Sequence, residues 1–345
     1  MSYLLRLRQF INNPEKLDLD KAWIKLNEIS QPPILVYGEA LALSLLRSDK
    51  VAPTDFIKYY KKLLKLNSQS LPTLDTIFQV SPVLLSGEQH LQAKKAFSKK
   101  YRLIEEGLQN WLPNYTSKFF ESLSFDNELN PIIMINNYIV GFFETILSID
   151  LNVHQNEIPP LPPKLFFLTQ TFSKLNDVEM KLATLKTFIE KTLIIQNRDP
   201  SETWMLLTIM VAGFEALEST LLYGLTMQPK GVNWEAKELI REAAAVNFIG
   251  RRVTQNFTVE DLNLVVNQEI YICPTLIHRS IDQGNTSKNL NSFSFGKGAH
   301  TCIGQFITES IINSFFMEWP KYFNQLKLVL PVKYTRDFNL DFTLK

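Results

Sequence analysis

Cys302 is the residue of this sequence whose type and surroundings best suit chemistry at a metal. It lies in the glycine-rich segment FGKGAHTCIG, directly before an apolar stretch with helical spacing. Backbone N–H groups at a helix start stabilise a thiolate, and glycines let a flat ligand approach the backbone because they have no Cβ atom. The segment therefore suits a thiolate that binds a metal held in a flat macrocycle.

The other cysteine, Cys273, has an ordinary structural interpretation. It lies between Ile272 and Pro274 in a strand-like run, and most free cysteines are small buried side chains. Two cysteines are too few for the disulfide framework of a small secreted domain. The cysteine content therefore favours a reducing cytoplasm.

The spacing F-x-x-G-x-H-x-C-x-G in this segment resembles the cysteine-ligand loop of the cytochrome P-450 family. The resemblance implies that the cofactor is haem b, that Cys302 is the axial ligand of its iron, and that the loop surrounds the cofactor. The matching cofactor-binding positions are Phe295, Gly298, His300 and Gly304. Further segments resemble the family in the correct order, so the chain is identified as a short, divergent member of the bacterial type.

Three cations are placed like the family residues that bind the haem propionates. The segment GEQHLQAKKAF resembles the start of the family's C helix, with His90 and Lys94 at the two propionate-binding positions. Their four-residue step puts both on one helix face. Lys94 replaces the more common arginine and offers a point charge instead of a two-pronged donor. Arg251 is placed like a further arginine that pairs with a propionate.

A structural motif of the family precedes Arg251. Glu238 and Arg241 match its E-x-x-R helix, in which a buried carboxylate and guanidinium lie on one helix face and lock the surrounding loop. This spacing also occurs in solvated helices, where the pair contributes only tenths of a kcal/mol. Its weight here comes from Arg251 and from the tetrapeptide Ile277–Ser280, which is similar to the family's later A-N-R-D turn.

The segment MVAGFEALES resembles the long helix that crosses the distal face of the haem. Ala212, Gly213 and Glu215 match the family pattern A-G-x-[D/E]-T-T and are the candidate catalytic residues. Ala216 and Leu217 occupy the two threonine positions, so the hydroxyl that helps to deliver protons to bound dioxygen is absent. A positioned general acid contributes typically about 10²–10⁴-fold, so this departure matters.

The missing hydroxyl leaves three alternatives open. Glu215, Ser219 or a hydroxyl of the substrate could relay protons; the enzyme could use peroxide or catalyse a reaction without oxygen activation; or the protein could bind haem without oxygenating anything. Glu215 also has a structural interpretation, as a carboxylate bonded inside the core. Gly213 favours the functional interpretation because it permits close approach of a ligand.

The elements that position these residues are mainly helices. Apolar residues at three- and four-residue spacing predict helices at Leu17–Ile29, Glu39–Leu46, Asp55–Leu66, Glu88–Trp111, Pro131–Ile149, Val178–Ile195, Ser201–Leu225, Ala236–Ala244 and Cys302–Phe316. Strand signals lie at Ile34–Tyr37, Phe248–Thr254, Glu269–Thr275 and Gln325–Leu330. The predicted fold class is mainly α with a small β-sheet subdomain, as in the cytochrome P-450 fold.

Residues 1–345 are expected to form a single domain of this kind, with its β-rich part near 31–37 and 248–280. The N-terminal sheet hairpin of the family is expected to be reduced to Ile34–Tyr37. The polar segment Asp282–Ser292 predicts an irregular loop.

Charge and hydropathy exclude several other classes of function. The chain has 36 Lys and Arg against 35 Asp and Glu, so no global field attracts nucleic acid or an anionic membrane. The long apolar run Trp204–Met227 contains Glu215 and Glu218, which favours a core helix over a membrane span. We find no secretion signal at the N-terminus, so we expect a cytoplasmic protein without membrane or nucleic-acid partners.

The expected activity is that of a monooxygenase, which oxidises a small apolar substrate or a biosynthetic intermediate with O2 and external electrons. The alternatives are a peroxygenase or another haem-thiolate tailoring enzyme, and a non-catalytic relative that binds a ligand. The expected partners are a small-molecule substrate, a ferredoxin-type electron donor and, as a further option, a carrier protein. A basic surface would attract such a partner, with the candidates Lys94, Lys95, Lys99, Lys100 and Lys297.

Overall fold

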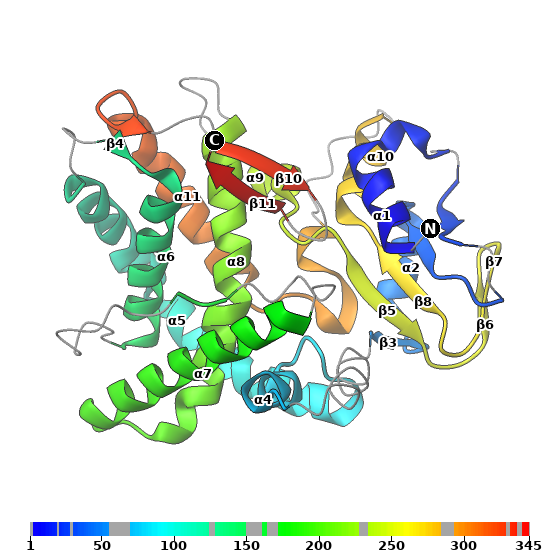
Figure 1. The fold of residues 1–345 in the computed structure, drawn as a ribbon, viewed down its shortest axis with the longest axis horizontal. Coiled ribbons are helices and arrows are strands. Elements are labelled where there is room, and N and C mark those ends of the chain that lie inside the picture. Colours follow the sequence, from blue (N-terminus) through cyan, green and yellow to red (C-terminus); the bar gives the residue numbers. More distant parts are fainter. Residues whose placement is uncertain are drawn as a thin grey trace. The chain divides into compact units, whose positions relative to one another are not determined.

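The computed structural model describes residues 3–18, 21–27, 30–54, 70–123, 128–149, 161–163, 172–227, 234–283, 293–328, 332–336 and 340–344. The chain forms two compact units, and most of their elements are labelled in Figure 1. The first unit comprises Met1–Asp55, Lys237–Cys302 and Tyr334–Asp341. The second comprises Phe56–Ala236, Ile303–Lys333 and Phe342–Lys345.

A five-stranded sheet in the order β1-β2-β8-β5-β3 forms the centre of the first unit. Its strands are β1 (Trp23–Lys25), β2 (Ile34–Val36), β3 (Val51–Pro53), β5 (Ile249–Val253) and β8 (Glu269–Ile272). β2 and β8 are parallel, and the other neighbouring pairs are antiparallel. The strands β6 (Phe257–Val259) and β7 (Leu262–Leu264) form a separate antiparallel pair. Two segments that are far apart in the sequence therefore share one sheet.

The sheet of the first unit is covered on both faces. Ile34 and Val36 of β2 belong to one core cluster and Leu35 to the other, as the alternation of side chains along a strand requires. The helices of this unit are α1 (Tyr3–Asn12), α2 (Glu39–Arg47), α9 (Ala236–Ala243) and α10 (Pro274–Gln283). Residues of α2 pack with Ile34, whereas residues of α1 pack with Leu35. Cys273 is buried in the α1 cluster, which agrees with its structural interpretation.

Helices make up most of the second unit. They are α4 (Pro72–Val80), α5 (Gly87–Glu121), α6 (Pro131–Leu147), α7 (Phe172–Ile195), α8 (Thr203–Met227) and α11 (Gln305–Tyr322), with the 3-10 turn η3 (Pro200–Glu202) before α8. α8 contacts α4, α6, α7 and α11, and α5 contacts α6 and α11. A helix packed by neighbours on several sides must be apolar nearly all round, which explains the weak amphipathic pattern of α8.

Two short sheets complete the described elements. β4 (Glu128–Leu129) pairs in parallel with β9 (Lys327–Leu328), and β10 (Val332–Arg336) pairs with β11 (Leu340–Leu344).

Buried hydroxyl groups join three helices of the second unit. The Thr116 hydroxyl of α5 donates to the Leu112 carbonyl at 3.0 Å. Since it has one hydrogen, it accepts from the Tyr138 hydroxyl of α6 at 2.9 Å and from the Ser314 hydroxyl of α11 at 2.7 Å. Burial raises the pKa of Tyr138. The network fixes the register of these helices, because a shift of one helix would leave a hydroxyl without its hydrogen-bond partner, and this costs free energy.

The start of α4 is capped by a side chain from α7. Leu71 at the N-cap position makes no side-chain hydrogen bond. The Glu179 carboxylate instead accepts from the backbone N–H groups of Thr73 and Leu74, each at 2.9 Å. A carboxylate at a helix N-terminus satisfies unpaired donors and the positive end of the helix dipole together.

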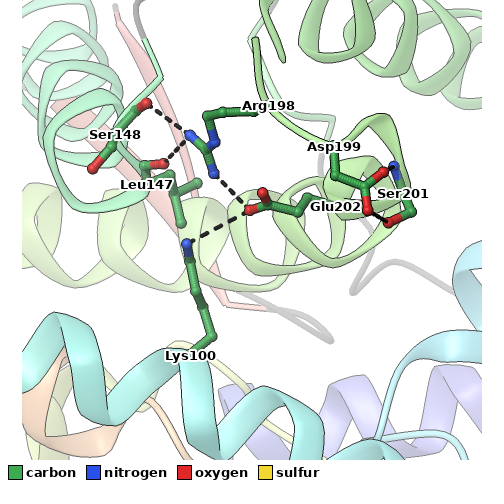
Figure 2. Close-up of polar contacts among 7 residues, drawn as sticks. All are labelled: Lys100, Leu147, Ser148, Arg198, Asp199, Ser201 and Glu202. Atoms are coloured by element: carbon green, nitrogen blue, oxygen red, sulfur yellow. Dashed lines mark hydrogen bonds and ion pairs between the residues drawn. The ribbon is translucent and has the colours of Figure 1, made fainter. Parts of the chain in front are cut away.

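A second polar cluster holds the end of α6 against the turn that leads into α8 (Figure 2). The Arg198 guanidinium donates to the carbonyls of Leu147 and Ser148, at 2.8 and 2.7 Å, and to the Glu202 carboxylate at 2.6 Å. Lys100 of α5 lies 3.8 Å from the same carboxylate. One arginine therefore satisfies carbonyls at a helix C-terminus that have no partner within the helix.

Within the described part of the chain, one segment, Pro200–Met227, is long and apolar enough to cross a membrane by length and composition. Within its most apolar window, 78% of the residues are buried inside the protein. This burial is typical of a core helix, as the sequence predicts.

The structure confirms most of the predicted elements and corrects two. The predicted helix Leu17–Ile29 is wrong, because Trp23–Lys25 forms β1 and pairs with β2. The N-terminal sheet is not reduced to Ile34–Tyr37, since that strand is one of five. The predicted helix Asp55–Leu66 lies outside the described residues, as does nearly all of the predicted loop Asp282–Ser292. Besides β1, the helices and strands that the periodicity did not predict are α1, α4, α10, β3, β4, β6, β7, β10 and β11.

Candidate functional site

The loop around Cys302 consists of two short helical turns joined by glycines. The turns are η4 (Phe293–Phe295) and η5 (Gly298–His300). Gly296 and Gly298 have φ angles of 66° and 73°, which residues with a Cβ atom rarely adopt. The Cys302 N–H donates to the Phe295 carbonyl at 2.9 Å and closes the loop, and the Cys302 side chain is exposed. The loop therefore presents its thiol on a backbone that the glycines make possible.

Gly298 is also required by packing against α2. A Cβ atom at this position would lie 2.3 Å from the Leu46 carbonyl oxygen and 3.2 Å from the Cα atom of Arg47. Burial and the nearby Arg47 lower the pKa of Lys297, while Glu39 opposes the shift. The end of α2 thus packs closely against the loop, and this contact requires a residue without a Cβ atom at position 298.

Arg251 in β5 is a buried cation. Its side chain is 7% exposed, and one guanidinium nitrogen donates to the Gly250 carbonyl at 2.9 Å. Burial lowers its pKa to about 10. Among the described residues, no carboxylate forms an ion pair with it. A buried guanidinium of this kind is costly unless an anion compensates it, so its chemistry fits a ligand carboxylate such as a haem propionate.

His90 and Lys94 lie one turn apart near the start of α5, as predicted. His90 is buried, and its Nδ1 atom lies 2.7 Å from the Pro82 carbonyl oxygen. Because a carbonyl only accepts, Nδ1 carries the hydrogen of this bond. Lys94 is half-buried. The Pro82 contact fixes the orientation of the His90 ring.

The segment that resembles the distal helix lies in the middle of α8. Ala212 is exposed and Gly213 and Ala216 are partly exposed, although almost all other residues of the helix are buried. Ala212 and Ala216 are one turn apart and share a face. This exposed face of α8 therefore carries only small side chains.

Gly213 has a close neighbour in α6. A Cβ atom on Gly213 would lie 2.9 Å from the Cζ atom of Phe143. The structure therefore gives this glycine a packing role, which the sequence alone did not indicate.

The acidic residues of α8 lie inside the helical unit. Glu215 is 2% exposed and Glu218 is 4% exposed. The helical period places Glu218 away from the Ala212 face, while Glu215 borders it. Of the two carboxylates, only Glu215 is placed for a role at this face.

Only one residue of the predicted E-x-x-R pair, Arg241, is buried. Arg241 is 9% exposed, whereas Glu238 is exposed. The expectation of a buried Glu238 carboxylate is wrong, because Leu239 and Ala243 occupy the buried side of α9 and Glu238 faces away from them. A guanidinium nitrogen of Arg241 donates instead to the His278 carbonyl at 3.0 Å.

Sequence reasoning did not identify His278 as a contact residue. Its buried ring forms hydrogen bonds with the backbone of Arg241 in α9 and of Phe293 in η4. It appeared only as the second residue of the IHRS tetrapeptide. The signal available in the sequence was a histidine at the place where the family turn has asparagine.

The candidate residues divide between the two units. The first unit contains Phe295, Gly298, His300 and Cys302 in one loop, together with Arg251, Glu238 and Arg241. The second contains His90, Lys94, Ala212, Gly213, Glu215 and Gly304. Gly304 lies at the start of α11, where a Cβ atom would be 3.1 Å from the Tyr101 ring of α5.

No protein-family model matches this chain, and no curated protein sequence matches it. Solved structures do match. P-450 RauA, complexed with a biosynthetic intermediate of aurachin RE, has a TM-score of 0.72 and 14% identity, covering 99% of this chain and 97% of that chain. P-450 BioI, in complex with an acyl carrier protein bearing hexadec-9Z-enoic acid, has a TM-score of 0.72 and 12% identity, covering 97% and 98%.

The cytochrome P-450 PksS of the Bacillus subtilis 168 bacillaene polyketide synthase gives a TM-score of 0.70 at 16% identity, covering 100% of this chain and 95% of that chain. These matches extend over almost the whole of both chains in each comparison. The chain therefore has the cytochrome P-450 fold, with a mainly helical body and a small mixed sheet.

Proposed function

We propose that this protein is a haem-thiolate oxidoreductase with Cys302 as the axial ligand of the haem iron. The observation that carries the proposal is the Cys302 loop, in which two glycines at positive φ present an exposed thiol ahead of α11. The cytochrome P-450 fold and the buried cation Arg251 support it independently. The finer proposal is a monooxygenase that acts with O2 and external electrons.

The chain supplies distinct functions around the haem b. Cys302 would hold the iron, while Arg251, His90 and Lys94 would bind the propionates, and Phe295, His300, Gly298 and Gly304 would line or shape the binding site. The haem, when bound, supplies the activation of dioxygen, which thiolate ligation favours. Arg251 binds through charge, and its burial strengthens the attraction to a propionate carboxylate because little water screens it.

Proton supply is the step in which this chain departs from its family. Ala212 and Ala216 carry only methyl side chains on their face of α8, and Gly213 carries none. Leu217 is buried. Glu215 borders the same face and is the residue we propose to hold or release a proton there, through water or through a hydroxyl of the substrate.

The missing hydroxyl also supports a second candidate function. An enzyme that uses peroxide, or a tailoring enzyme that needs no dioxygen activation, requires less proton delivery. A non-catalytic relative that binds a ligand would require none. Product formation that depends on electrons separates the monooxygenase from these alternatives, and turnover driven by peroxide separates a peroxygenase from a binding protein.

We propose a small apolar molecule or a biosynthetic intermediate as the substrate. P-450 RauA was solved with a biosynthetic intermediate, and P-450 BioI with an acyl carrier protein. A carrier protein that presents the substrate is therefore a candidate partner besides a ferredoxin-type electron donor. We further propose that residues 1–345 act as a single domain in the cytoplasm.

An exposed basic ridge on α5 supports an acidic protein partner. Leu91, Lys95, Lys99 and Leu103 follow one another at four-residue steps, Arg102 lies beside them, and all five are exposed. None of the three cations forms an ion pair with a described residue. Charges left unpaired at a surface attract an acidic protein, and the two leucines offer apolar contact.

The test is spectroscopic. Protein produced with haem supplied is reduced and treated with carbon monoxide, and a strongly red-shifted Soret band is expected. Cys302→Ser should abolish this band while the circular dichroism of the helices is retained. Cys273→Ala is the matched control, since Cys273 is buried in the core, and it should keep the band. Equal spectra for Cys302→Ser and the parent would reject the assignment.

A further inference from the structure

We infer that His278 is a positioning residue for the Cys302 loop. It holds the start of that loop through Phe293 and connects it to α9. The inference rests on the proposed function of Cys302, but the hydrogen bonds that carry it lie entirely within the first unit.

The hydrogen bonds of the His278 ring define its tautomer. The Phe293 N–H donates to Nε2 at 2.9 Å, so Nε2 carries no hydrogen. Nδ1 therefore carries the hydrogen and donates it to the Arg241 carbonyl, which lies 3.0 Å away. The ring is 4% exposed, so both bonds are made away from water. A neutral imidazole thus connects the backbone of α9 with the first residue of η4.

Arg241 also forms a hydrogen bond with His278 through its side chain. A guanidinium nitrogen of Arg241 donates to the His278 carbonyl at 3.0 Å, so the two residues are joined by one bond in each direction. The Ser294 hydroxyl adds a third tie by donating to the Ile240 carbonyl at 3.1 Å. Arg241 is therefore connected to the loop through His278, whereas Glu238 is exposed.

The effect of His278 reaches Cys302 through two backbone hydrogen bonds. The Gly296 N–H donates to the Phe293 carbonyl at 2.9 Å, and the Cys302 N–H donates to the Phe295 carbonyl at 2.9 Å. Fixing Phe293 from outside therefore fixes the turn whose last carbonyl holds Cys302. The family turn has asparagine at the position of His278, and imidazole reaches further while still donating at one end and accepting at the other.

The test compares three variants of the haem-bound protein. His278→Phe keeps a ring of similar volume and removes both hydrogen bonds, and His278→Gln keeps one donor and one acceptor. Thr275→Val is the matched control, because Thr275 is also in α10 and its buried hydroxyl donates to the Asn247 side chain at 2.8 Å. The readouts are the melting temperature and the share of reduced, carbon monoxide-treated haem with the red-shifted Soret band.

We expect His278→Phe to lower that share at least threefold relative to Thr275→Val at a similar melting temperature, with partial rescue in His278→Gln. Equal spectra in His278→Phe and Thr275→Val would show that His278 contributes stability alone, and would overturn the inference. Hydrogen exchange in haem-free protein gives a second readout, in which the Phe293 and Cys302 amides should exchange faster in His278→Phe only. If the parent lacks the red-shifted band, the proposed function fails, and this exchange experiment still decides the inference.

Discussion

At the scale of single residues, the proposed role of Arg251 as an anion ligand opposes its effect on the stability of the haem-free protein. Burial lowers its pKa from an ordinary value of 12.5 to about 10, and a shift of this size corresponds to about 3 kcal/mol against the charged form. The folded-state pKa is lower than the unfolded one, so this destabilisation is present in full below about pH 10 and is relieved as the pH rises further. A bound propionate would offset it at neutral pH.

We therefore expect Arg251→Met to stabilise the haem-free protein by about 1–3 kcal/mol, since methionine keeps the apolar stem and removes the buried charge. The same variant should bind haem at least tenfold more weakly. Chemical denaturation and haem titration measure the two effects. Arg252→Met is the control, because Arg252 follows in the same strand and pairs with Asn267 at the surface. A variant that lost stability and kept its haem affinity would contradict the propionate role.

Gly298 permits a test of backbone conformation against packing. Gly298 and Gly87 both have positive φ angles, 73° and 57°, but only Gly298 has a close neighbour. Gly87→Ala should cost about 1–2 kcal/mol of unfolding free energy, which is the penalty for a Cβ atom in the left-handed region. Gly298→Ala should cost clearly more, because its Cβ atom would lie 2.3 Å from the Leu46 carbonyl oxygen. Denaturant unfolding of both variants gives the comparison, and equal losses would mean that α2 can move aside.

At the scale of elements, the Arg198 cluster determines how α6 ends (Figure 2). Arg198→Met should cost about 2–3 kcal/mol of unfolding free energy, because two helix carbonyls and the Glu202 carboxylate lose a charged donor. Lys100→Met should change it by no more than about 0.5 kcal/mol, since Lys100 lies 3.8 Å from Glu202 and both side chains retain solvent contact. The two variants can be compared by denaturation. Similar losses for both would show that the cluster acts through its summed charge.

The helices that positioned the candidate site were largely predictable, because their apolar spacing repeats over several turns. α6 begins at Pro131, as predicted, with the Asn130 side chain accepting from the backbone amides of Ile132 and Ile133. Short strands were less predictable. β1 has three residues and depends on its pairing with β2, so local spacing in Leu17–Ile29 suggested a helix instead. The pairing with β2 lies outside the window in which the spacing was measured, and strand formation depends on such neighbours more than on local preference.

Among the site residues, too, those determined by local sequence were predictable and those that depend on tertiary packing were not. The Cys302 loop was predictable because its glycines are needed at fixed positions, and the structure finds positive φ at Gly296 and Gly298. The exposure of Glu238 and the hydrogen bonds of His278 were not predictable, since each depends on which face of α9 or α10 is buried. A motif indicates which residues are present, but tertiary packing decides which of them make the contact.

At the scale of the molecule, the net charge of +1 gives no long-range preference for a partner, so any attraction must be local. The α5 ridge of Lys95, Lys99 and Arg102 is such a local charge. We expect reversal of these three residues to glutamate to lower the rate of reduction by an acidic ferredoxin at least tenfold at low salt. The rate should also become less sensitive to salt, because the attraction that salt screens has been removed.

The control reverses three other exposed lysines, Lys118, Lys191 and Lys237, which changes the net charge by the same amount. Stopped-flow reduction over a series of ionic strengths distinguishes the two triple variants. If only the ridge variant is reduced slowly, the partner binds to the local arrangement of charge on α5. Equal slowing in both variants would mean that the partner responds to the net charge, and the α5 ridge would then have no special part in docking. Because both variants carry the same net charge, any difference between their rates belongs to the position of the charges.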